Sequence, residues 1–326
     1  MKFFRSIFSI ALLFAAIAPA SSQRIINRYS LDLVKIKDGY RLQDESKIRR
    51  YKLFDIDNAP ADMFIPFERK RLYIKDDDYH QAETKVVVFK QYPGYDLKMA
   101  IDLPRERTGE KLPFIIWIHG GGWHMGDFNG HSLHSRYLAG NGIAGVRISY
   151  SLLTQDATFE DSWSDIQDAV KYIREHAEEY GLDPSRFGFA GHSAGGHLAA
   201  YAAMRTPGTK LLVAFNGIYD LVHTVNEFVP SSRHDKYFGL SSLESRKNAS
   251  PVTFVHPDAP YCLLTYSSGD VLVDKAQVVT FTQALRENNV KYDLLYKDYY
   301  SHMGFIDTDL LEPTLMRVLI EAKKRL

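Results

Sequence analysis

The chain has 326 residues, of which 45% are hydrophobic and 25% are charged, an ordinary globular composition. This length can bury the core of one large α/β domain. Forty lysines and arginines balance 40 aspartates and glutamates. Without a basic excess or a basic stripe, nucleic acid is not expected as a partner.

The N-terminal residues 1–20 have the pattern of a signal peptide. Lys2 and Arg5 give a basic start, residues 7–18 are almost wholly apolar, and Ala18-Pro19-Ala20 fits a signal-peptidase site. The apolar run is shorter than the roughly twenty residues that a membrane span needs. We therefore expect cleavage after Ala20, a secreted or periplasmic protein, and no membrane attachment after cleavage.

Residues 21–84 form an N-terminal segment of uncertain structure, charged and rich in tyrosine. Their sequence leaves open whether they form a lid or an irregular covering. The sole cysteine, Cys262, lies in an apolar run and has no partner for an internal disulfide. We interpret it as a small buried hydrophobic residue.

Strands and helices are predicted to alternate along residues 85–326, which we interpret as one domain. The predicted strands are residues 85–90 and 97–102, paired around Pro93-Gly94, then 114–118, 143–150, 186–190, 261–266 and 292–296. The predicted helices include residues 165–180, ending at Gly181, a helix after residue 193, one around 278–285, and a terminal helix opened by Pro313. This alternation predicts an α/β fold with a mostly parallel, doubly wound sheet and helices on both faces.

The motif Gly191-His-Ser193-Ala-Gly195 lies between a predicted strand and a predicted helix. A G-x-S-x-G turn in that setting holds its serine in a strained, exposed conformation, because side chains in place of the glycines would clash with the neighbouring elements. We therefore interpret Ser193 as a nucleophile.

A second glycine-rich motif, His119-Gly-Gly-Gly-Trp123, follows the predicted strand 114–118. Cleavage of an ester by a serine passes through a tetrahedral oxyanion, which needs preorganised hydrogen-bond donors about 3 Å away. We expect the backbone N–H groups of Gly121 and Gly122 to supply them, together with that of Ala194. For Trp123 two readings stay open, a substrate-binding platform and an anchor for the loop.

A serine triad also needs an acid and a base, which follow the serine in that order in hydrolases with this turn. Asp270 comes directly after the predicted strand 261–266, and His302 lies in a loop before the terminal helix. We expect His302 to move the proton of Ser193 and Asp270 to orient the imidazole. Asp274 is the alternative acid.

Several other histidines flank these motifs. Those at 119, 124, 131 and 134 are spread over a glycine loop, without the helical spacing of known zinc motifs or a cluster of carboxylates. His192 and His197 beside the nucleophile are expected to pack or to form hydrogen bonds. We predict neither a metal site nor a cofactor.

These motifs together resemble the α/β-hydrolase superfamily, in particular its hormone-sensitive-lipase-like esterases and its bifunctional feruloyl/acetyl xylan esterases. The resemblance spans roughly residues 97–319. Its markers are HGGGW (119–123), ISY (148–150), Asp165, YGLDPSRFGFAGHSAGGHLAA (180–200), SPVTFVHPDAP (250–260), SGDVLVD (268–274) and SHMGF (301–305). In these families the matching serine, acid and histidine form the triad, which implies the same roles for Ser193, Asp270 and His302.

The motifs and the resemblance together predict a secreted serine esterase that works through an acyl-enzyme, with residues 85–326 as its α/β-hydrolase catalytic domain. Export and the resemblance favour removal of acetyl or feruloyl groups from plant polysaccharide, so the expected partner is an ester substrate, acylated polysaccharide included. An amide hydrolase, either formamidase-like or a peptidase, is the main alternative, and a non-catalytic binding module is a further one. The oligomeric state stays open.

Overall fold

The structure of the protein is a computed structural model. It describes residues 33–36, 39–42, 81–107, 109–222, 237–238, 242–298, 300–306 and 311–326. The predicted signal peptide lies outside these residues. The chain divides into two compact units, residues 1–66 and 67–326. In the first, strands β1 (Leu33–Ile36) and β2 (Gly39–Leu42) form an antiparallel hairpin.

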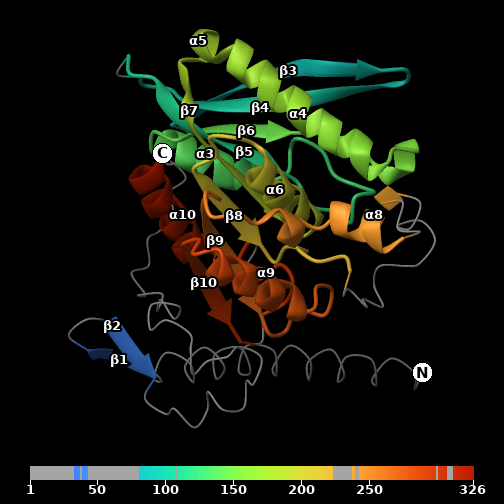
Figure 1. Cartoon of the computed structure of the whole chain (residues 1–326). Helices are drawn as coiled ribbons and strands as arrows, with labels where there is room; N and C mark the ends of the chain where they lie inside the picture. The colour runs from blue at the N-terminus through green and yellow to red at the C-terminus, as the bar shows by residue number, and fades with distance from the viewer. Residues whose placement is uncertain are drawn as a thin grey trace, which may run out of the picture. The chain divides into compact units, whose positions relative to one another are not determined.

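The second unit contains a sheet of eight strands in the order β10-β9-β8-β7-β5-β6-β4-β3. Figure 1 shows this sheet running from β3 to β10. The pairs among the first six strands in this order are parallel, whereas β4 is antiparallel to β6 and to the edge strand β3. The strands are β3 (Ala82–Tyr92), β4 (Tyr95–Pro104), β5 (Leu112–Ile118), β6 (Ala144–Ile148), β7 (Leu182–His192), β8 (Leu211–Phe215), β9 (Tyr261–Ser267) and β10 (Tyr292–Lys297).

Helices cover both faces of this sheet (Figure 1). On one face α3 (Ser132–Gly140) packs beside α10 (Leu311–Arg325), and on the other α4 (Phe159–Glu175) packs beside α6 (Ala194–Arg205). The other helices in the described part of the chain are α5 (Ala177–Tyr180), α8 (Leu243–Asn248), α9 (Ala276–Glu287) and the short 3-10 turns η4 (Leu153–Gln155) and η5 (Pro251–Phe254). The predicted fold class is confirmed.

The apolar sequence runs explain why the sheet lies between two layers. Every residue of β6, β8 and β9 is buried, as strands covered on both faces require. The predicted hairpin around Gly94 is confirmed by the antiparallel pairing of β3 with β4. Because parallel strands end at one edge of the sheet, the loops after β5, β7, β8 and β9 meet there.

The start of one helix lies well before the predicted residue, and several elements were not predicted, among them a strand of the sheet and a helix that covers it. Helix α4 begins at Phe159, six residues before 165, because Thr158 and Asp161 form a reciprocal cap at its start. Gly181 ends α5 in the left-handed region at φ 68°, as expected. Strand β8 and helix α3 were not predicted.

Cys262 is buried, and burial raises the pKa of its thiol, in agreement with the predicted structural role. Among the described residues, no helix combines the length and the apolar character that crossing a membrane requires.

Candidate active site

The turn at Ser193 joins β7, which ends at His192, to α6, which begins at Ala194. Ser193 has φ 57° and ψ −123°, a conformation that L-residues rarely adopt. The Ser193 N–H donates to Phe215 O over 2.9 Å, which ties the turn to the end of β8. A Cβ on Gly195 would lie 2.5 Å from His119 O, so only glycine fits there. The strand, turn and helix therefore present Ser193 as a G-x-S-x-G elbow does.

Asp270 and His302 come together at the end of β9. Nδ1 of His302 lies 2.7 Å from Oδ2 of Asp270, and both residues are buried. Burial alone would raise the pKa of Asp270, but hydrogen bonds from His302 and Asn216 hold it below its usual value. The ionised carboxylate accepts a hydrogen bond from the Nδ1–H group of His302. In this tautomer Nε2 of His302 carries a free lone pair.

Asn216 is a site residue that the sequence did not reveal. It follows β8, has φ 43°, and donates from its amide to Oδ2 of Asp270 over 2.7 Å. Thr265 donates to its Oδ1 over 2.9 Å, which turns the amide nitrogen toward Asp270. The only sequence signal was an asparagine directly after an apolar run.

His192 supports His302 from the side. Its Nε2 donates to the backbone oxygen of His302 over 2.9 Å, and the two ring centroids lie 4.5 Å apart. Burial lowers the pKa of His192 to about 3, so its ring is neutral at neutral pH. His192 therefore acts as a hydrogen-bonding residue, as its sequence position indicated.

Ser193 and His302 line one pocket, and Nε2 of His302 has no hydrogen-bond partner among the described residues. Hydrogen bonds between nucleophile and base are often long or poorly aligned in free enzymes and tighten when substrate binds. In this arrangement Nε2 of His302 is available to accept a proton from a group in the pocket.

Residues 119–125, which we call the glycine loop, line the same pocket as Ser193 and His302. Gly121 and Gly122 have φ of 115° and 60°, and a Cβ on Gly120 would lie 2.7 Å from His192 O. The N–H of Ala194 begins α6 and therefore has no partner within the helix. Among the described residues, the N–H groups of Gly121 and Gly122 donate to no backbone oxygen. Three N–H donors are thus available near Ser193.

Trp123 is 3% exposed. Its indole nitrogen donates to Nδ1 of His197 over 3.2 Å, and its ring meets Phe238 edge to face at 4.9 Å. These contacts favour the interpretation of Trp123 as an anchor for the loop over its interpretation as a substrate-binding residue. Asp274, the alternative acid, is exposed and accepts a hydrogen bond from Ala276 N instead of reaching His302.

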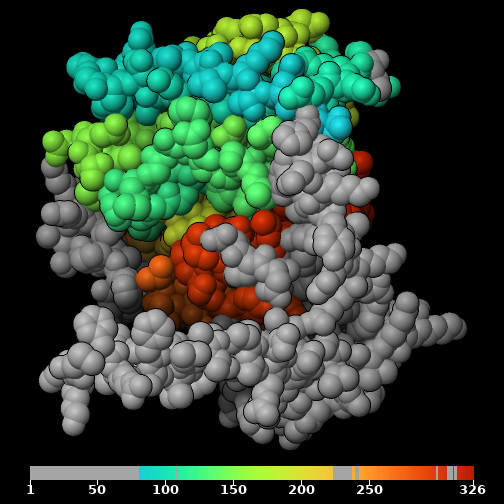
Figure 2. Space-filling view, turned by 180° about the vertical axis from the view of Figure 1, so that it is seen from behind, coloured from blue at the N-terminus to red at the C-terminus, as the bar shows by residue number. Residues whose placement is uncertain are grey.

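The pocket encloses about 870 Å³. In Figure 2 the green residues that follow β5 adjoin the orange and red residues of the C-terminal third, the two parts of the chain that line most of it. Asp127 is the single acidic residue in the described lining, which includes no lysine or arginine. Burial lowers the pKa of the lining residues His119 and His134 to about 4, so both are neutral at neutral pH. The apolar lining residues are Met125, Leu133, Ile218, Leu272, Val273, Met303, Ile306 and Leu311.

Within the part of the chain that the structure describes, no three histidine, cysteine or acidic side chains gather as ligands for a metal ion. The histidines of the pocket instead make ring contacts. His119 stacks on Tyr150 with centroids 4.3 Å apart, and His131 and His134 meet edge to face at 5.1 Å.

The sheet, the elbow at Ser193 and the acid and histidine at its edge define an α/β-hydrolase. The BD-FAE family model matches residues 99–285, and the chain belongs to this family. The predicted resemblance is therefore confirmed.

Known proteins similar to the chain bear esterase names. A probable isoprenylcysteine alpha-carbonyl methylesterase, ICMEL1, from Oryza sativa subsp. japonica is 28% identical over 69% of this chain and 58% of its own length. The probable carboxylic ester hydrolase LipM from Mycobacterium tuberculosis is 31% identical over 68% of this chain and 55% of its own length. The chain thus spans little more than half of these relatives.

The fold also matches a solved structure, a truncated form of a carbohydrate esterase from gut microbiota. Its TM-score is 0.63 at 21% identity, covering 76% of this chain and 98% of that one. At this identity the likeness shows the shared fold.

Proposed function

We propose that the protein is a secreted serine carboxylesterase that acts through an acyl-enzyme on Ser193. The observation that carries the proposal is the 2.7 Å hydrogen bond between His302 and Asp270 in the pocket that Ser193 also lines. Membership of the BD-FAE family and the esterase names of the relatives support it.

In the first half-reaction, Oγ of Ser193 bonds to the carbonyl carbon of the ester while Nε2 of His302 takes the hydroxyl proton. The carbonyl oxygen becomes an oxyanion and accepts hydrogen bonds from the N–H groups of Gly121, Gly122 and Ala194. The intermediate then expels the alcohol oxygen, which takes the proton from His302. The acyl group remains on Ser193.

In the second half-reaction, water replaces the alcohol. His302 takes a proton from the water, whose oxygen bonds to the acyl carbon, and returns it to Oγ of Ser193 as the acid leaves. Asp270 stays ionised throughout and stabilises the imidazolium that forms in each half-reaction.

For the substrate we propose acetyl or feruloyl esters of plant polysaccharide. The family resemblance and the signal-peptide pattern of residues 1–20 support this choice. A pocket of about 870 Å³ with several apolar lining residues has room for an aromatic acyl group as well as for an acetyl group.

The test uses the chain from Ser21, as wild type, Ser193→Ala and the control Ser185→Ala at an exposed serine. Each is assayed on p-nitrophenyl acetate, methyl ferulate, acetylated xylan and p-nitroacetanilide. We expect ester cleavage by wild type and Ser185→Ala, and a loss of about 10⁴-fold or more in kcat for Ser193→Ala. Faster cleavage of the anilide than of every ester would favour the amide hydrolase. Folded wild type that cleaves nothing and does not react with a fluorophosphonate would refute the proposal.

Export is tested separately. Cells that express the whole chain should release protein whose N-terminal residue is Ser21. Protein retained in the cytoplasm with residues 1–20 intact would contradict a secreted enzyme.

A further inference from the structure

We infer that Asp165 is a positioning residue that holds the glycine loop in its working geometry. It does so through residues 149–154, which we call the bracing segment. The inference rests on the proposed function, because it concerns the placement of the N–H groups of Gly121 and Gly122.

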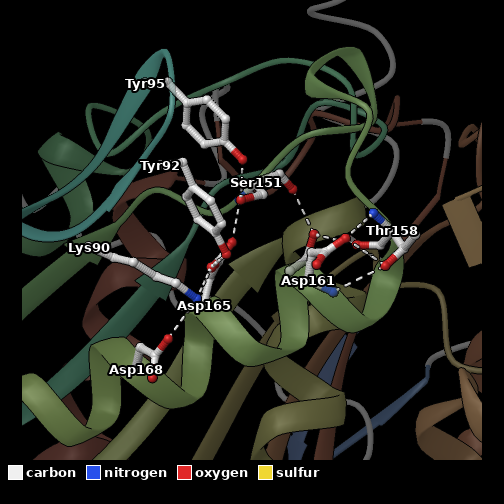
Figure 3. A network of polar contacts seen from close by, with 9 residues as sticks. Lys90, Tyr92, Tyr95, Ser151, Thr158, Asp161, Asp165 and Asp168 are labelled. Atoms are coloured by element: carbon white, nitrogen blue, oxygen red, sulfur yellow. Dashed lines mark hydrogen bonds and ion pairs between the residues drawn. The ribbon is translucent and has the colours of Figure 1, made fainter.

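Asp165 is a fully buried carboxylate on α4 with three donors around it. Oδ1 accepts from Nζ of Lys90 and from the hydroxyl of Tyr92, each over 2.7 Å. Oδ2 accepts from the backbone N–H of Ser151 over 2.8 Å. Figure 3 shows Lys90 and Tyr92 reaching from β3 toward Asp165. The carboxylate thus joins the edge strand, α4 and the bracing segment.

Ser151 is held firmly in the middle of the bracing segment. Besides the bond to Asp165, its backbone oxygen accepts from the hydroxyl of Ser162 over 2.6 Å, also from α4. Its own hydroxyl lies 3.0 Å from that of Tyr95 (Figure 3). Because both backbone polar groups of Ser151 are bonded to α4, the segment cannot shift without breaking buried hydrogen bonds.

The bracing segment in turn contacts the glycine loop along much of its length. The hydroxyl of Tyr150 donates to His119 O over 3.1 Å, and its ring stacks on that of His119. Leu153 N donates to Trp123 O over 2.9 Å, and the hydroxyl of Thr154 donates to His124 O over 3.1 Å. These contacts hold both sides of Gly120, Gly121 and Gly122.

The glycines cannot fix their own conformation, because residues without Cβ have many backbone states open to them. Oxyanion donors stabilise the transition state only if they are preorganised, and a displacement of about 1 Å can cost about 100-fold in rate. A carboxylate at residue 165 can hold the bracing segment because its two oxygens together accept hydrogen bonds from all three donors. The ammonium group of Lys90 balances the buried charge.

The test compares Asp165→Asn with Asp168→Asn in the chain from Ser21. Asp168 is the matched control, since it lies on the same helix and binds the same Lys90 over 2.6 Å, but its side chain is 43% exposed whereas that of Asp165 is fully buried. The amide that Asp165→Asn introduces presents one acceptor oxygen to three donors, so the hold on Ser151 weakens. We expect kcat per fluorophosphonate-labelled site to fall about 10- to 100-fold with KM within about threefold. Asp168→Asn should retain the wild-type kcat.

Binding of a trifluoromethyl ketone separates positioning from stability, because this inhibitor adds to the serine and forms the oxyanion. Its inhibition constant should rise for Asp165→Asn by the factor by which kcat/KM falls. A lower melting temperature with unchanged kcat per labelled site and unchanged inhibition would overturn the inference. Wild type that neither cleaves esters nor labels would instead overturn the proposed function.

Tyr150→Phe keeps the inference testable if Asp165→Asn does not fold. It removes only the hydroxyl that donates to His119 O, and we expect kcat to fall about 10-fold. In the double variant Asp165→Asn/Tyr150→Phe, the two losses should combine to less than their product, because both act through the bracing segment. Fully multiplicative losses, or a Tyr150→Phe variant with the wild-type kcat, would contradict this route.

Discussion

The amide of Asn216 and the imidazole of His302 both donate to Oδ2 of Asp270, each over 2.7 Å. One oxygen of the carboxylate thus accepts hydrogen bonds both from the residue that follows β8 and from the loop that carries His302. The other oxygen accepts the backbone N–H groups of Leu272 and Val273. Both carboxylate oxygens of Asp270 are therefore held by hydrogen bonds in the absence of substrate.

The shared oxygen predicts a measurable role for Asn216. We expect Asn216→Gly, which tolerates the φ of 43°, to lower kcat about 10-fold with little change in KM, because Asp270 loses a donor that holds its orientation. Thr265→Val keeps the amide and should cost less. An Asn216→Gly variant as active as the wild type would show that Asp270 needs no such support.

Replacing each of the two nearby aspartates in turn tests which one is the acid. Asp270→Asn should lower kcat about 10⁴-fold, because the amide no longer favours the Nδ1–H tautomer of His302. Asp274→Asn should keep most activity and lose at most some stability, since the exposed carboxylate of Asp274 accepts a hydrogen bond from Ala276 N, outside the Asp270–His302 pair. Steady-state kinetics on p-nitrophenyl acetate distinguishes the two. Equal losses in both variants would contradict the assignment.

Two glycines, Gly181 before β7 and Gly195 just after it, predict different costs of substitution. Gly181 has φ 68° with open space around it, so Gly181→Ala should cost only the strain of that conformation, about 1–2 kcal/mol. Gly195→Ala also places a Cβ against the backbone at Ile118 and His119, and we expect it to unfold at a much lower urea concentration. Urea denaturation of both variants measures the difference. Similar urea midpoints would mean that the backbone around Gly195 can shift to make room for a Cβ.

Buried histidines predict that the stability depends on pH. Burial lowers the pKa of His119, His134 and His197 to about 4, whereas the unfolded chain titrates near 6.5. Below about pH 6.5 the unfolded state therefore binds more protons than the folded state. Stability should be constant above that pH and should fall as the pH drops toward 4.

The variant His134→Phe tests this pH dependence. The ring of His134 already packs against Trp117 and Phe215, so phenylalanine suits the site. We expect the change of the free energy of unfolding with pH near pH 5 to shrink by about one proton. Urea midpoints between about pH 5 and pH 8 measure it. A slope equal to that of the wild type would mean that His134 is not neutral in the folded chain.

Much of the fold followed from local patterns. The apolar runs of β5 and β9 and the three-and-four spacing in α4 were readable because burial on two faces or on one stripe leaves a direct mark on composition. Strand β8 bears the same apolar mark over its five residues but was not predicted, whereas helix α3, in which polar and apolar residues mix, left a weaker mark.

The site was readable where a motif fixes the backbone and where the serine–acid–histidine order along the chain points to the triad. The elbow around Ser193 and the glycine loop follow from glycines at set spacings. Asn216 and the contacts of Asp165 depend on pairings across the sheet, such as Lys90 with Asp165, 75 residues apart. Such pairings come from the order of strands, which local sequence does not encode.

The absence of cationic side chains from the described pocket lining bears on how a reaction cycle ends. In the proposed reaction each turnover converts a neutral ester into a carboxylate, yet that lining supplies no lysine or arginine to pair with it, and His119 and His134 stay neutral. The N–H groups of Gly121, Gly122 and Ala194 can donate hydrogen bonds to a newly formed anion, but no lysine or arginine of that lining pairs with its charge. We therefore expect the acid product to dissociate quickly and to inhibit weakly even as it accumulates.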